Sequence, residues 1–190
     1  WIATPVMVMA GLNQDGQVGY SINPWVGCAH NCTYCWSRDM RGMSREDWQN
    51  PVIKAQFFNL DDLEAKLPAQ VKPGNLLLSA TTDFFQPSER GTIAVQESVL
   101  IGLARVKDKD LQVWILTKSN TFVKFLPLLE GAKVGVSISS LGPIEQEVFA
   151  PIPILRHLAL GEAKKAGCST YISIEPWIPG ITQPREIIEM

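Results

Sequence analysis

Three cysteines lie within eight residues, in the segment Cys28-Ala29-His30-Asn31-Cys32-Thr33-Tyr34-Cys35. Three thiolates from one short loop can hold three irons of a [4Fe–4S] cluster and leave the fourth iron without a protein ligand. One further cysteine, Cys168, lies far along the chain. The C-x3-C-x2-C spacing therefore favours a cluster that is open to a small chelating ligand over a ferredoxin, whose cluster is closed by protein.

S-adenosylmethionine is a ligand of that kind. Its amino and carboxylate groups can bind one iron while an electron from the cluster breaks its sulfonium C–S bond and produces a carbon radical. The spacing of the cysteines, with the aromatic Tyr34 before the last of them, is similar to the signature of the radical S-adenosylmethionine superfamily.

Two other uses of cysteine compete with this interpretation. A structural zinc site needs four ligands, but His30 stands between the first two cysteines and His157 is remote. A non-catalytic zinc or Fe–S module remains the main alternative. A disulfide framework is disfavoured by the length of the chain, by its four cysteines and by the lack of a secretory signal.

The composition is that of a soluble globular domain, with 190 residues, of which 46% are hydrophobic and 19% charged. No run approaches the ~18 apolar residues of a membrane span, so we expect no membrane partner and a cytoplasmic protein. The net charge of −2 gives no global support for nucleic-acid binding. A nucleic-acid-binding protein, in which the fold is only a scaffold, is a third alternative.

The chain opens on Trp1 and stops at Met190 inside a predicted helix, and we interpret it as a fragment.

The elements that must position the cysteines follow from hydrophobic periodicity. A first strand is expected to end near Asn23, after the apolar run Ile2–Met9 and a turn at Asp15-Gly16, and a helix is expected over Leu60–Leu67. Four more strands are predicted at Leu76–Ser79, Leu111–Leu116, Val134–Ser139 and Tyr171–Ile174. Helices are predicted between these strands at Thr92–Arg105, Thr121–Glu130 and Ile154–Ala166. This alternation predicts an α/β fold, with a parallel sheet in an open or partial β/α barrel of about five strands.

In such folds the chemistry lies at the carboxyl ends of the strands. Polar residues follow each predicted strand there: the cysteine loop, Thr81-Thr82-Asp83, Thr117-Lys118-Ser119, the serines 137, 139 and 140, and Glu175. We expect these residues to lie together at one end of the sheet. Ser119 could equally cap a helix, and Asp83 or Glu175 could contact the ribose or amino group of a bound cofactor or pair with a neighbouring cation.

Five separated segments resemble one branch of the superfamily, the spore photoproduct lyase-like proteins that are related to DNA repair photolyase. They are the cysteine block 23–38, the block 82–90, Thr117-Lys118-Ser119, the block 136–139 and the block 178–182, in the same order. The resemblance implies a partial (β/α)6 barrel whose sixth strand would lie past Met190. It also implies one radical S-adenosylmethionine core domain over residues 1–190, truncated at both ends.

The resemblance further implies roles for individual residues. Cys28, Cys32 and Cys35 would ligate the [4Fe–4S] cluster, and Lys118 would offer its ammonium to the carboxylate of S-adenosylmethionine. Ser139 and Ser137 would hydrogen-bond the same carboxylate, and Thr82 would contact the methionyl part. A flavodoxin- or ferredoxin-like protein would donate the electron.

One position departs from the pattern. The lyase that repairs spore photoproduct has a cysteine that returns a hydrogen atom to the product radical, and Ala80 stands at that position here. The expected activity is therefore reductive cleavage of S-adenosylmethionine to a 5′-deoxyadenosyl radical that abstracts hydrogen from an unidentified substrate. A lyase or DNA-repair reaction is the relevant context, but repair by the cysteine route is put in doubt.

Overall fold

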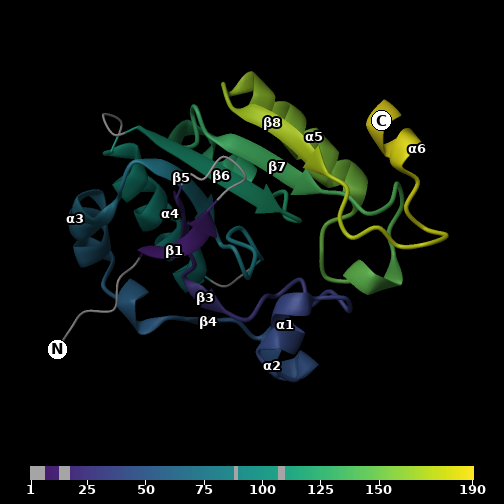
Figure 1. Ribbon diagram of the computed structural model, residues 1–190, viewed down its shortest axis with the longest axis horizontal. Coiled ribbons are helices and arrows are strands. Elements are labelled where there is room, and N and C mark those ends of the chain that lie inside the picture. Colours follow the sequence, from purple (N-terminus) through teal and green to yellow (C-terminus); the bar gives the residue numbers. More distant parts are fainter. Residues whose placement is uncertain (1–6, 13–17, 88–89, 107–109) are drawn as a thin grey trace.

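A mostly parallel sheet forms the centre of the molecule (Figure 1). The computed structural model describes residues 7–12, 18–87, 90–106 and 110–190. Within them, the sheet has six strands in the order β1-β2-β5-β6-β7-β8, with β1 antiparallel to β2 and the other five strands parallel. The strands are β1 (Met7–Leu12), β2 (Val18–Ile22), β5 (Gly74–Leu78), β6 (Leu111–Thr117), β7 (Lys133–Ser137) and β8 (Ser169–Ser173). The predicted α/β fold with five parallel strands of a partial barrel is confirmed.

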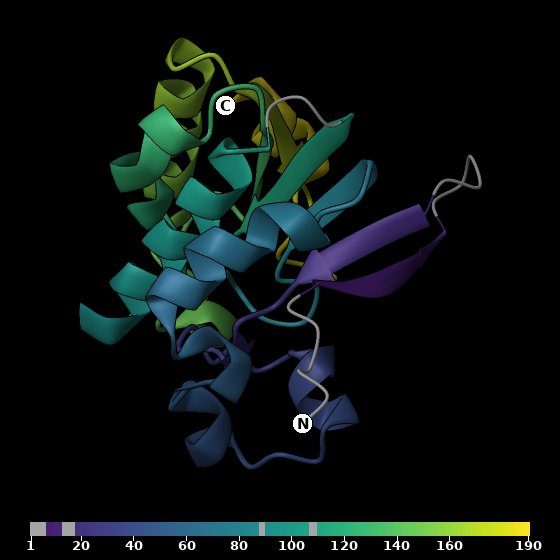
Figure 2. The ribbon, with the colours of Figure 1, turned by 90° about the vertical axis from the view of Figure 1, so that its left-hand side faces the viewer.

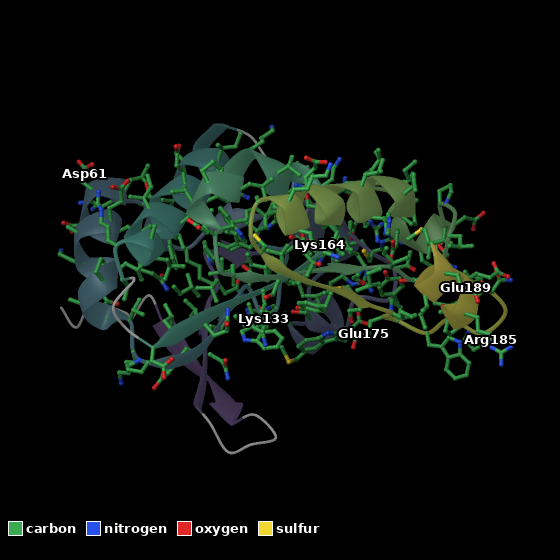
Figure 3. The ribbon with its side chains drawn as sticks, turned by 90° about the horizontal axis from the view of Figure 1, so that it is seen from above. Asp61, Lys133, Lys164, Glu175, Arg185 and Glu189 are labelled. Atoms are coloured by element: carbon green, nitrogen blue, oxygen red, sulfur yellow. The ribbon has the colours of Figure 1, made fainter. Side chains whose placement is uncertain are left out.

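The two faces of this sheet differ in character. Leu76, Ile115, Val134 and Val136 are completely buried and belong to the main core. Residues of the opposite face alternate with them along each strand. Figure 3 shows Lys133 and Glu175 on the face turned away from the helices. On β7, Lys133 and Ser137 therefore lie on the face opposite to the buried Val134 and Val136.

Helices cover the apolar face (Figure 2). They are α3 (Leu60–Gln70), α4 (Arg90–Ala104), the 3-10 helix η2 (Thr121–Leu128) and α5 (Pro153–Lys165). The predictions for α3, α4 and α5 are confirmed. The predicted α-helix over Thr121–Glu130 is wrong in type and length: the segment is a 3-10 helix that ends at Leu128, just after Pro127, which has no N–H and whose ring disfavours a continuing α-helix.

Short elements surround the cysteine loop. They are β3 (Trp25–Val26), α1 (Trp36–Met40), α2 (Arg45–Gln49), β4 (Val52–Ile53) and η1 (Ala55–Phe57). The 3-10 helix η3 (Glu145–Glu147) precedes α5, and α6 (Pro184–Glu189) follows β8. The predicted turn at Asp15-Gly16 and the start of the run from Ile2 lie outside the described residues. None of the helices that the structure describes is long and apolar enough to cross a bilayer.

Candidate functional site

A cavity of about 420 Å³ opens at the carboxyl ends of the parallel strands. The sequence places polar residues after successive strands, and the parallel order of β2, β5, β6, β7 and β8 brings those ends to one edge. Eight of the nine residues predicted for the site line this cavity: Cys28, Cys32, Cys35, Thr82, Asp83, Lys118, Ser137 and Glu175. Ala80 is also part of the wall.

Ser139, the ninth, lies behind the wall. Its side chain is fully buried, and its hydroxyl lies within hydrogen-bonding distance of two acceptors, Glu147 Oε1 (3.0 Å) and the carbonyl of Glu175 (2.9 Å), between which its single proton is shared. Both bonds fix the end of β7 against neighbouring segments. Ser137 does line the cavity, where its Oγ accepts from Lys118 Nζ (2.9 Å) and donates to the Glu175 carbonyl (2.6 Å).

Backbone contacts fold the cysteine loop against α2. Gly27 has a φ of +94°, and a Cβ on it would lie 2.7 Å from the carbonyl oxygen of Trp48. That same carbonyl accepts from the N–H of Cys28 (2.7 Å). Within the loop, the N–H of Cys35 donates to the carbonyl of Cys32 (3.2 Å). The glycine before the first cysteine is therefore required for the close approach of the loop to α2.

Two of the three thiols are almost completely buried. Cys28 and Cys32 are 8% and 7% exposed, and Cys35 is half-buried. Burial raises the pKa of Cys28 to about 12 and that of Cys32 to about 11, so both are neutral thiols in the metal-free chain. No group of three His, Cys, Asp or Glu side chains in the described residues is arranged to hold a metal ion. A bound metal would itself supply the positive charge that deprotonates such thiols.

Three buried polar atoms of residues beside the cavity have no hydrogen-bond partner among the described residues. They are Ser37 Oγ, Trp48 Nε1 and Ser79 Oγ. Ser37 and Trp48 are 2% and 0% exposed, so these atoms lie beneath the cavity surface. The cavity wall itself offers the three thiols of one loop, which fits a group with sulfur ligands such as an iron–sulfur cluster.

Asp83 joins three segments of the site. Its carboxylate accepts from His30 Nε2 (3.1 Å), Thr117 Oγ1 (2.7 Å) and the N–H of Lys118 (2.7 Å). Burial would raise the pKa of Asp83, but the neighbouring His30 and the hydrogen bonds from Thr117 and Lys118 outweigh burial and hold the pKa below its ordinary value. Asp83 therefore ties the cysteine loop to the end of β6 as an ionised carboxylate.

Lys118 brings a cation to the cavity. Its ammonium donates to Ser137 Oγ and lies 5.5 Å from the centre of the Tyr34 ring. No carboxylate in the described residues forms an ion pair with it, although it faces the cavity. An ammonium held by a hydroxyl and a ring face leaves hydrogen-bonding capacity for an anionic ligand.

A buried ion pair was not predicted from the sequence. Arg156 Nη2 donates to Glu147 Oε2 at 2.5 Å, and the two side chains are 1% and 3% exposed. Tyr34 Oη donates to the same carboxylate, and Arg156 Nη1 donates to the carbonyl of Ser137 (2.8 Å). The pair therefore connects α5, the end of β7 and the cysteine loop. No local signal marks it, because Arg156 is one polar position of a predicted helix and Glu147 ends the short 3-10 helix η3, which the sequence does not predict.

The other candidate metal ligands are engaged elsewhere. His30 is 2% exposed, and its Nδ1 lies 3.4 Å from the carbonyl of Phe149 while its Nε2 contacts Asp83. Cys168 precedes β8, at the opposite edge of the sheet, and its thiol donates to the carbonyl of Leu129 (3.2 Å). Neither is placed to complete a four-ligand site with the three cysteines.

Thr82 is held in place from outside the cavity. Its hydroxyl donates to Asn23 Oδ1 (2.7 Å), and the Asn23 side-chain amide donates to Thr81 Oγ1. The loop after β5 is thereby fastened to the segment that enters the cysteine loop. Ser79, at the start of this loop, has a φ of +62°, which is uncommon for a residue with a side chain.

Comparison of the sequence with known protein families finds no matching family model. An uncharacterized protein of Methanocaldococcus jannaschii is 27% identical over 176 residues, which are 89% of this chain and 64% of that protein. An uncharacterized protein of Mycobacterium tuberculosis is 25% identical over 185 residues, which are 90% of this chain and 53% of the relative. The chain therefore spans between half and two thirds of the length of these relatives.

Solved structures give a clearer match. A spore photoproduct lyase variant with bound AdoMet and dinucleoside spore photoproduct matches with a TM-score of 0.60 and 18% identity, over 83% of this chain and 45% of that one. A second, complexed with dinucleoside spore photoproduct, matches with a TM-score of 0.61 and 17% identity over 84% and 46%. The chain has the fold of spore photoproduct lyase. At this identity the match establishes the fold alone, and it agrees with the resemblance that the sequence blocks carry.

Proposed function

We propose that this chain is the core of a radical S-adenosylmethionine enzyme. The observation that carries the proposal is one cavity of about 420 Å³ lined by all three thiols of the C-x3-C-x2-C loop and by the ammonium of Lys118. A metal-binding loop and an unpaired cation in the same cavity suit a ligand that is both metal-chelating and anionic. The fold shared with spore photoproduct lyase, one structure of which has bound AdoMet, supports the same proposal.

Cys28, Cys32 and Cys35 would hold the [4Fe–4S] cluster. When bound, the cluster would supply the electron that cleaves S-adenosylmethionine reductively into methionine and a 5′-deoxyadenosyl radical. Cys28 and Cys32 are almost completely buried, which would shield their side of the cluster from solvent. His30 bonds to Asp83 and Cys168 to the carbonyl of Leu129, so neither is free to be a fourth ligand. This supports a cluster with one open iron over a zinc module built from Cys and His.

Lys118 would bind the carboxylate of S-adenosylmethionine, with Ser137 orienting the ammonium. Thr82 and Glu175 line the same cavity and would contact the rest of the cofactor. Asp83 accepts hydrogen bonds from three protein segments, so in this proposal it positions the loop and Lys118. Ser139 acts from behind the wall by fixing the Glu175 carbonyl.

The substrate is the finer part of the proposal. The solved neighbours bind a dinucleoside spore photoproduct, so a lyase-type or DNA-repair-related substrate is the first class to test. Ala80 offers no thiol at the cavity wall, so the hydrogen atom of the final step must come from a different donor.

The deciding experiment uses anaerobically reconstituted protein, reduced with dithionite or with a flavodoxin-like donor. We expect about four irons per chain, an electron paramagnetic resonance signal that changes on addition of S-adenosylmethionine, and formation of 5′-deoxyadenosine. Cys32→Ser should abolish all three, whereas the matched control Cys168→Ser should retain them. A protein that binds zinc and gives no signal would favour the non-catalytic module and overturn the proposal.

A further inference from the structure

One buried ion pair holds both of the residues that hold the ammonium of Lys118. This ammonium donates to Ser137 Oγ (2.9 Å) and lies 5.5 Å from the centre of the Tyr34 ring. Tyr34 Oη donates to the carboxylate of Glu147, and the carbonyl of Ser137 accepts from Arg156 Nη1 (2.8 Å). Glu147 and Arg156 bond to each other at 2.5 Å, and neither lines the cavity. Both supports of Lys118 are therefore attached to the same pair behind the cavity wall.

The pair itself is held in one orientation. Glu147 Oε2 accepts from Arg156 Nη2, whereas Glu147 Oε1 accepts from Tyr34 Oη. The guanidinium also donates to two backbone carbonyls, at 2.6 and 2.8 Å. The side chains of Arg156 and Glu147 are only 1% and 3% exposed. A planar guanidinium with acceptors in three directions has little freedom to turn, so the groups bonded to it are fixed as well.

The cysteine loop is attached a second time to the 3-10 helix that carries Glu147. The N–H of Thr33 donates to the carbonyl of Gln146 (3.0 Å), the residue before Glu147 in η3. Tyr34 thus contacts η3 through its own hydroxyl and through the backbone of the residue before it. Its ring is therefore held at both ends, and its face gives the ammonium of Lys118 a fixed surface.

We propose that Glu147 and Arg156 are positioning residues that place the ammonium of Lys118 for ligand binding, acting through Tyr34 and Ser137. The inference rests on the proposed function, in which Lys118 binds the carboxylate of S-adenosylmethionine. It assigns a part in cofactor binding to two residues outside the cavity wall. A lysine ammonium stands on a flexible four-carbon stem, so affinity is gained when it is already in place before the ligand arrives.

Tyr34→Phe separates the attachment of the ring from the ring itself. The variant keeps the aromatic face beside Lys118 and removes only the hydroxyl that bonds to Glu147. Tyr20 supplies a matched control, because Lys72 lies 6.0 Å from the centre of its ring and Tyr20 does not line the cavity. Tyr20→Phe therefore removes the same hydroxyl from a similar pair of lysine and tyrosine elsewhere in the molecule.

The test is a double-mutant cycle on the binding of S-adenosylmethionine, measured by equilibrium dialysis of reconstituted proteins with equal iron content. We expect Tyr34→Phe to weaken binding about 3- to 10-fold in the wild-type background and to have no further effect in the Lys118→Met background. Tyr20→Phe should leave the affinity unchanged in both backgrounds. A merely structural role of the Tyr34 hydroxyl would weaken binding by the same factor in both, and that result would overturn the inference.

Arg156→Lys tests the other member of the pair. It keeps a positive charge beside Glu147 but loses the planar fork that donates in three directions, so we expect the same dependence on Lys118. Arg105, which is 54% exposed and donates to both the carboxylate and the carbonyl of Glu64, supplies the control. Arg105→Lys should bind as the wild type does. Tyr34→Phe leaves the ion pair intact and so decides the question if Arg156→Lys fails to fold.

The position of Lys118 has a second readout that needs neither cluster nor cofactor. Protons over an aromatic ring are shifted by its ring current, and the loss of a signal in Lys118→Met identifies those of Lys118 in NMR spectra of the metal-free protein. We expect Tyr34→Phe and Arg156→Lys to move this signal toward that of a free lysine, and Tyr20→Phe to leave it in place. An unmoved signal in the first two variants would overturn the inference. If the signal moves but the wild type takes up no cluster, the positioning is supported and the proposed function is overturned.

Discussion

At the scale of single residues, the candidate site depends on charges whose partners are few and identifiable. Lys118 faces the cavity without an ion pair in the described chain, whereas Lys133, on the next strand, lies over the Trp114 ring with 4.1 Å between ammonium and ring centre. Lys118 is therefore placed to bind an anionic ligand in the cavity, whereas Lys133 is not.

Lys118→Met should weaken the binding of S-adenosylmethionine roughly 10- to 100-fold, because a hydrogen bond to a charged group is worth about 1.5–3 kcal/mol. Equilibrium dialysis of the reconstituted protein measures the affinity. The control Lys133→Met lies outside the cavity wall and should bind as the wild type does. Equal affinities for Lys118→Met and the wild type would contradict the role given to Lys118.

Glu147 gives the site an acid-dependent stability. Burial would raise the pKa of Glu147, but the cations of Arg156 and Lys118 outweigh it and hold the folded-state pKa below the ordinary value of 4.5. The unfolded chain then binds the proton more readily, so the stabilisation is present above pH 4.5 and is lost as the pH falls through the folded-state pKa.

Glu147→Gln should reduce the free energy of unfolding near neutral pH by roughly 3 kcal/mol, because it leaves Arg156 buried without its counter-charge. The difference from the wild type should shrink as the pH falls below 4.5, since a protonated glutamate resembles glutamine. Urea unfolding across this pH range measures it. The exposed pair of Glu162 and Lys165 on α5 supplies the control Glu162→Gln, which should change little at any pH. If the difference in free energy of unfolding between Glu147→Gln and the wild type did not vary with pH, this role of the Glu147 charge would be contradicted.

The sequence indicates some residues of the site and is silent on others for a physical reason. The cysteines are marked by their spacing, and Lys118 and Glu175 by their place directly after predicted strands. Glu147 and Arg156 matter through their contact with each other and with Tyr34 and Ser137, which lie elsewhere in the chain. Such partners are fixed only when the sheet has formed, so no local pattern encodes them.

At the scale of elements, some features likewise follow from local sequence patterns and others do not. The buried strands were predictable because a parallel sheet covered by helices requires continuous apolar runs. The segment after β6 has helical periodicity, but it forms a 3-10 helix that ends one residue after Pro127. The contact between the cysteine loop and α2 depends on a single glycine, Gly27.

Gly27→Ala tests this contact. Its φ of +94° strains any side chain, and the new Cβ would also meet the carbonyl of Trp48. Gly42 has a φ of +61°, but a Cβ added there would meet nothing within 4 Å, so Gly42→Ala isolates the backbone strain. We expect about 1 kcal/mol of destabilisation for Gly42→Ala and about 1–3 kcal/mol more for Gly27→Ala from overcrowding. Thermal unfolding of both variants measures the difference, and equal losses would show that the close approach is unimportant.

At the scale of the whole molecule, net charge limits the partners of this chain. A net charge of −2 provides little general attraction to a polyanion. Non-specific DNA binding typically has dissociation constants of about 10⁻⁴–10⁻⁶ M at physiological salt. We expect this chain to bind duplex DNA more weakly than that range, as measured by fluorescence anisotropy. Tight binding that falls steeply with added salt would instead favour the nucleic-acid-binding alternative.

The segments that line the cavity are synthesised in the order in which they occur in the sequence. The ribosome releases the cysteine loop first, then the loop after β5, then Lys118, and Glu175 last. At about 5–20 residues per second, roughly 7–28 s separate the synthesis of Cys35 and Glu175. During that interval the thiols belong to an unfinished polypeptide that has no cavity to bury them. The cavity that shelters these cysteines from oxidants is thus completed late, after Glu175 has been synthesised.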